Sequence, residues 1–86
     1  MSEVGLIDRK ATAREVSSHA ADVRRLAGAA GLPGPRLRDD GTIVVHSEEP
    51  GYRAVTRLSA TLSELVGVYV HVITDDAPAA GSAREL

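Results

Sequence analysis

The sequence predicts a small α+β (α/β) domain, with elements in the order α-β-β-α-β and a three-stranded mixed sheet. Three observations support this class: two stretches with apolar residues at helical spacing, one β-branched and almost wholly apolar run, and one alternating run. The chain has 86 residues and no cysteine, so neither disulfides nor thiolate metal sites can stabilise it. We expect one domain over residues 11–76, an N-terminal extension over 1–10 and a flexible tail over 77–86.

A capping box begins the first predicted helix. The Thr12 hydroxyl can accept a hydrogen bond from the Glu15 amide, and the Glu15 carboxylate can accept one from the Thr12 amide. Apolar residues then recur at helical spacing from Val16 to Ala30, over about four turns. We expect Gly28 or Gly31 to end this helix, because Pro33 prevents its continuation.

The predicted sheet begins with a hairpin. An Asp-Gly pair separates the β-prone runs 36–38 and 42–47. The second run is nearly all apolar, as expected of a central strand buried on both faces. An amphipathic helix over 52–66 and a strand over 68–74 follow. A right-handed crossover through this helix would make the strands 42–47 and 68–74 parallel neighbours.

Composition argues against several functions. The net charge is −2, and the chain has only two aromatic residues, which disfavours binding to nucleic acid through bulk charge or base stacking. No apolar run approaches 18 residues, and the first residues do not resemble a secretion signal. We therefore expect a cytoplasmic protein with neither a membrane nor a nucleic acid as its partner.

Patterns for catalysis or metal binding are weak. Ser17 and Ser18 precede His19, but adjacent side chains on a helix diverge, so polar surface residues are expected here. His46 and His71 lie on strands predicted to be neighbours and could meet, although no two histidines have the spacing of a helical zinc site. We predict no cofactor and no metal.

Four arginines are the candidate contact face for an acidic or phosphate-bearing partner. Two belong to a strand start and two to a helix start, which the crossover topology can bring to one side. Guanidinium groups suit bidentate pairing with carboxylates and phosphates. The alternative is a solvated face balanced by nearby acidic residues. The four residues are Arg36, Arg38, Arg53 and Arg57.

Four stretches, 19–32, 35–38, 42–45 and 58–74, share the helix and strand pattern of one known family. They resemble the first helix, the first two strands and the closing helix–strand unit of the minimal nucleotidyltransferase (MNT) family. Members of this family are common as antitoxins beside HEPN-type RNase toxins. The resemblance extends over residues 13–86 and implies a truncated nucleotidyltransferase-like core.

The residues that the family uses for catalysis are incomplete. The resemblance implies two magnesium-binding aspartates two residues apart, where this chain has Asp40 and Thr42, and a third carboxylate where it has His71. The family's Gly-Ser signature, which holds the triphosphate, is missing as well. Magnesium requires hard oxygen ligands, so the resemblance implies a remnant site without transfer activity.

Three functions remain open. The first is a non-catalytic, nucleotidyltransferase-like binding module of antitoxin or regulatory type, whose partner would be a HEPN-like toxin or a second copy of the chain. The second is an unrelated small α/β protein-interaction domain. The third is a magnesium-dependent nucleotidyltransferase. We favour the first, because the core pattern is intact whereas the acids are lost.

Overall fold

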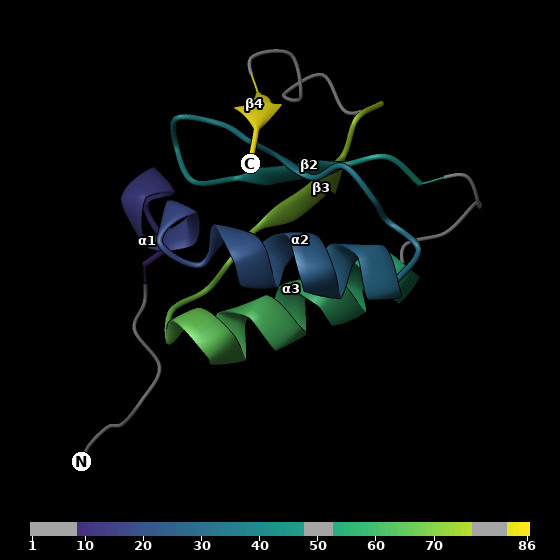
Figure 1. Ribbon diagram of the computed structural model, residues 1–86. Helices are drawn as coiled ribbons and strands as arrows, with labels where there is room; N and C mark the ends of the chain where they lie inside the picture. The colour runs from purple at the N-terminus through teal and green to yellow at the C-terminus, as the bar shows by residue number, and fades with distance from the viewer. Residues whose placement is uncertain (1–8, 48–52, 77–82) are drawn as a thin grey trace.

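A four-stranded mixed sheet with α2 and α3 on one face forms the body of the protein (Figure 1). The computed structural model describes residues 9–47, 53–76 and 83–86. The predicted α+β class is confirmed. The elements are α1 (Ala13–Ser17), α2 (Ala20–Ala29), β1 (Arg36–Leu37), β2 (Ile43–Val45), α3 (Arg53–Val66), β3 (Val72–Thr74) and β4 (Arg84–Glu85).

The predicted capping box is present, but the helix that it begins is broken. The Glu15 amide donates to Thr12 Oγ1 at 3.1 Å, and the Thr12 amide donates to Glu15 Oε1 at 2.9 Å. The Ser18 hydroxyl donates to the Glu15 carbonyl at 2.8 Å, which is the acceptor that the His19 amide would have in a continuous helix. The His19 amide donates to the Val16 carbonyl instead. A serine hydroxyl thus competes for a helical acceptor, and two helices replace the single one expected.

The end of α2 confirms one of the two predicted stop residues. The Gly31 amide donates to the Gly28 carbonyl at 3.1 Å, and the Leu32 amide donates to the Ala27 carbonyl at 2.8 Å. This pair of bonds defines a Schellman motif, which satisfies carbonyls that the helix leaves without partners. Leu32 is 2% exposed, so the chain turns back into the core immediately after the helix.

The hairpin and the crossover are both present as predicted. β1 pairs antiparallel with β2, with Arg36 opposite Val44, and the Gly41 amide closes the turn onto the Arg38 carbonyl at 3.0 Å. β2 pairs parallel with β3, with Ile43 opposite Val72. All three residues of β2 are at most 1% exposed, as expected of a central strand.

The prediction of three strands is wrong, because the sheet has a fourth. β4 pairs antiparallel with β1, with Glu85 opposite Arg36 and Arg84 opposite Leu37, which gives the order β3-β2-β1-β4. These residues belong to the segment for which we expected a flexible tail, and residues 77–82 of that segment lie outside the described part. Without β4, the outer edge of β1 would expose unpaired backbone groups.

The core lies between the helices and the sheet. Leu58 and Leu62 of α3 are at most 2% exposed and pack with Val23 of α2 and Ile43 of β2. Leu65, which follows Leu58 and Leu62 at helical spacing, is 40% exposed. The buried face of α3 is therefore narrower than its apolar spacing suggests.

Candidate functional site

The three remnant positions of the nucleotidyltransferase-like site lie close together. The Thr42 amide donates to Asp40 Oδ1 at 3.0 Å, which fixes both residues at the end of the β1–β2 hairpin. The Ile43 amide donates to the His71 carbonyl at 2.9 Å, and Ile43 pairs with Val72. Because side chains alternate along a strand, Thr42 and His71 both lie on the sheet face opposite that of Ile43.

Lys10 completes this site, and the sequence analysis missed it. Its Nζ donates to Thr42 Oγ1 at 2.7 Å and lies 3.2 Å from Asp40 Oδ2. A parallel bridge to Tyr69 holds its backbone, and the Ala11 amide donates to the Tyr69 carbonyl at 2.7 Å. The only sequence signal was a basic residue just before a helix cap, which does not identify a partner more than thirty residues away.

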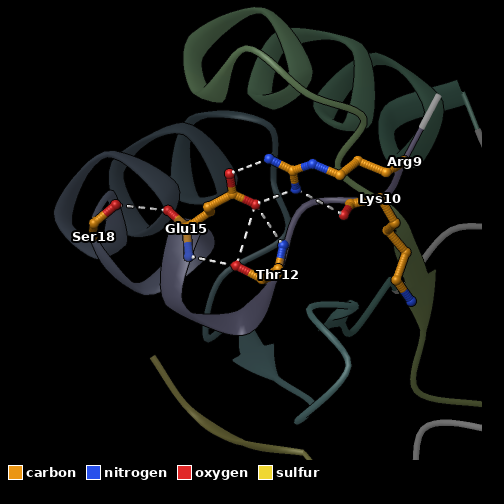
Figure 2. Close-up of polar contacts among 5 residues, drawn as sticks. All are labelled: Arg9, Lys10, Thr12, Glu15 and Ser18. Carbon is orange, nitrogen blue, oxygen red and sulfur yellow. Dashed lines mark hydrogen bonds and ion pairs between the residues drawn. The ribbon is translucent and has the colours of Figure 1, made fainter. Parts of the chain in front are cut away.

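A second ion pair holds the segment that carries Lys10. Arg9 contacts Glu15 through two bonds, each 2.7 Å long, and the same carboxylate caps α1 at Thr12 (Figure 2). The Lys10 side chain points away from this pair. The bond from Arg9, followed by that from the Thr12 amide, lowers the pKa of Glu15 to about 2. The backbone of Lys10 is thus held by the Arg9–Glu15 ion pair on its N-terminal side and by the Ala11–Tyr69 hydrogen bond on its C-terminal side.

Asp40 is held as a carboxylate. The Thr42 amide is the main cause that lowers the Asp40 pKa to about 2, and hydrogen bonding and charge from Lys10 add to it. Arg38 supplies a second cation, with its Nη1 at 3.8 Å from Asp40 Oδ2. The Nε of Arg38 is buried and has no hydrogen-bond partner among the described residues. We call Lys10, Arg38, Asp40 and Thr42 the Lys10 cluster.

The two strand histidines do not meet. His71 Nδ1 forms a hydrogen bond with the Tyr69 hydroxyl at 2.9 Å, near the beginning of β3. His46 pairs with Asp75 at 2.9 Å, beyond the other end of the same parallel strand pair. Within the described ranges there is no group of three histidine or acidic side chains that could hold a metal ion.

The four candidate arginines do not form one face. Leu37 is buried in the core, so Arg36 and Arg38 on either side of it lie on the sheet face without α2 and α3. Arg53 and Arg57 lie on α3, on the side opposite its buried residues Val55, Leu58 and Leu62. The structure therefore separates the predicted set into two pairs on opposite sides.

Two serines of α3 form a further polar site that sequence reasoning missed. Ser59 Oγ donates to the Val70 carbonyl at 2.5 Å, and the Val70 amide donates to Ser63 Oγ at 2.8 Å. Ser63 Oγ in turn donates to the Ser59 carbonyl at 2.7 Å. Both backbone groups of the fully buried Val70 are thereby satisfied by helix side chains. The sequence signal was serine at i and i+4 beside the apolar stripe.

Comparison with known proteins gives no family for this chain. No family model matches it, and no curated protein or solved structure matches it significantly. In the described part of the chain, no helix has the length and apolar character needed to cross a membrane.

Proposed function

We propose that this chain is a non-catalytic binding module that acts by contacting another protein. The observation that carries the proposal is the position of Lys10, whose ammonium group lies 2.7 Å from Thr42 Oγ1 and 3.2 Å from Asp40 Oδ2. A metal-dependent transferase needs this place beside its carboxylate for a divalent cation. A fixed ammonium neutralises Asp40 and repels a second cation.

We further propose that the module is a degenerate MNT-like protein of antitoxin type, with a HEPN-like toxin as its partner. The support is the element order, a helix pair followed by a hairpin and a parallel crossover, together with the clustering of Asp40, Thr42 and His71 at one end of the sheet. The second candidate is an unrelated interaction domain. The fourth strand and the lack of a family match favour that candidate.

The outer side of α3 is the contact surface that we favour. Arg53 and Arg57 are exposed there, one helical turn apart, and neither has an ion pair in the described part of the chain. Arg38, in contrast, is already engaged with Asp40 and partly buried. Arginines without intramolecular partners are free to pair with carboxylates of another protein.

A transferase assay tests the absence of catalysis. Incubation with labelled ATP, Mg²⁺ and candidate protein or RNA acceptors should give no transfer above a heat-inactivated control. Asp40→Asn serves as the matched variant, because it removes the only carboxylate of the Lys10 cluster. Transfer by the parent chain that Asp40→Asn abolishes would contradict the proposal.

A binding assay tests the contact surface. An RNase-like helical protein encoded beside this chain is the first partner to try, and a stable complex with it would favour the MNT-like proposal over the unrelated domain. Arg53→Ala with Arg57→Ala should then weaken binding at least about tenfold, equivalent to about 1.4 kcal/mol. The matched control, Arg36→Ala, changes an arginine on the other side and should leave affinity unchanged. Equal affinity of all three folded proteins would refute the assignment of this surface.

A further inference from the structure

The strand β4 is attached to the sheet by few interactions. It pairs with β1 over two residues, and the Leu86 amide donates to the Pro35 carbonyl at 3.3 Å, a long bond. Arg84 pairs with Asp39 at 3.1 Å, but these side chains are 77% and 86% exposed. Exposed ion pairs contribute little to stability. Leu86 is the one apolar side chain of this segment that packs against the core, and it is only partly buried.

The edge of β1 is nevertheless shaped to receive this segment. Leu86 packs partly against the core and, together with Gly28, Pro33 and Pro35, lines an open recess beside the edge of β1. Asp39 at the other end of β1 provides a carboxylate for the arginine at position 84. A strand edge without a partner is an adhesive surface. An extended segment with a basic residue followed, two positions later, by a large aliphatic residue therefore fits the edge of β1.

We propose that residues 84–86 of a second copy of the chain occupy this edge, so that two copies exchange their β4 strands. Each copy carries both the edge of β1 and the segment that fits it, so exchange reproduces every contact of the closed form without new surface complementarity. Undocking of β4 breaks few interactions, which makes the open form accessible. This inference is independent of the proposed contact surface on α3.

The length of chain between β3 and β4 sets the balance between the closed and exchanged forms. The two strands lie at opposite edges of the sheet, three strand spacings or about 14 Å apart. The register places Arg84 level with Val72, two residues or about 7 Å back from Thr74 along the strand direction. Together these offsets separate Thr74 from Arg84 by about 16 Å in a straight line. Ten residue steps from Thr74 to Arg84 can extend about 35 Å, which suffices.

Shortening this connection should force the exchange. Deletion of residues 77–82 leaves four steps, which reach about 14 Å and cannot span that distance. We expect the deletion variant to have twice the parent's mass by light scattering. The matched control replaces residues 77–82 with a Gly-Ser sequence of equal length, and it should keep the mass of the parent at the same concentration. A deletion variant that is folded by circular dichroism and remains monomeric would overturn the proposal.

A cysteine pair shows whether such a dimer arises by exchange. Arg36 of β1 and Glu85 of β4 form a non-hydrogen-bonded pair of these antiparallel strands. The Cβ atoms of such a pair are close enough for a disulfide. The chain has no other cysteine. Arg36→Cys with Glu85→Cys should therefore give a covalent monomer in the full-length chain and a covalent dimer in the deletion variant. Covalent monomers in both backgrounds would contradict exchange.

A mixing experiment on the full-length chain keeps the test valid if the deletion variant does not fold. One preparation carries only Arg36→Cys and the other, with an affinity tag, only Glu85→Cys, so a mixed disulfide can form only between copies. We expect the yield of mixed dimers to exceed the yield of either like-with-like dimer. This yield should increase with protein concentration. A yield of mixed dimers no greater than that of either like-with-like dimer, at every concentration, would overturn the proposal.

Discussion

Gly41 closes the turn between β1 and β2, and its replacement by alanine tests how firmly the N-terminal segment is held against this hairpin. The residue has φ +89°, and a Cβ atom built on it would lie 2.1 Å from the Ala11 carbonyl oxygen. Ordinary contacts of a Cβ atom begin at 3.4 Å. The backbone at Ala11 or at the turn must therefore move by about 1 Å.

The expected cost has two parts. A side chain at positive φ costs about 1–2 kcal/mol. Displacement of the Ala11 backbone would also break its 2.7 Å bond to the Tyr69 carbonyl, and a buried amide without a partner costs about 1–3 kcal/mol. Gly41→Ala should thus lower the free energy of unfolding by about 2–5 kcal/mol, a large fraction of the roughly 4–13 kcal/mol expected for a domain of this size.

Gly67→Ala is the matched control. Gly67 has φ +93°, but a Cβ atom there would meet nothing within 4 Å, so only the conformational cost of about 1–2 kcal/mol applies. Urea unfolding followed by far-ultraviolet circular dichroism measures both variants, because the chain lacks tryptophan. Equal losses of stability for the two variants would refute the close packing of Ala11 against the turn.

Three other perturbations test the core and the polar sites. Leu62→Ala should cost about 2–5 kcal/mol in urea unfolding, whereas Leu65→Ala should cost under about 0.5 kcal/mol, and similar values would show that α3 is rotated. Because the pKa of Asp40 is lowered from 3.8 to about 2, its contribution to stability is complete above pH 3.8 and is lost as the pH falls toward 2. Asp40→Asn should flatten the stability profile in this window, and an unchanged profile would exclude such a role. Ser63→Ala should cost about 1–3 kcal/mol by leaving the Val70 amide without a partner, and Ser63→Thr, which keeps the hydroxyl, should recover part of that loss; equal losses would argue against the bond.

Local rules explain which elements the sequence could predict. The capping box at Thr12, the Asp-Gly turn and the Gly31 stop each depend on residues within a few positions of one another, and all are present. The break at Ser18 was not predicted, because a serine can also lie within a continuous helix. In the structure the Ser18 hydroxyl donates to the Glu15 carbonyl, and the helix is broken at this position.

Long-range contacts account for what the sequence could not show. Lys10 and Thr42 meet only because the bridge between Lys10 and Tyr69 places the N-terminal segment beside the hairpin. β4 is two residues long, too short for a periodic signal, and it forms because β1 offers an open edge. The four arginines were predicted to share one side. Side chains alternate along β1 and Leu37 points into the core, so Arg36 and Arg38 lie on the other face of the sheet, away from α3.

The positions of the two proposed surfaces have a consequence for assembly. Arg53 and Arg57 lie on the side of α3 that faces away from the sheet, whereas the edge of β1 receives a strand in the plane of the sheet. Exchange of β4 between two copies would therefore leave the outer side of both α3 helices uncovered. A dimer of this kind would present two identical contact surfaces, and a partner with two matching sites would bind it more tightly than it binds the monomer, without any new contact.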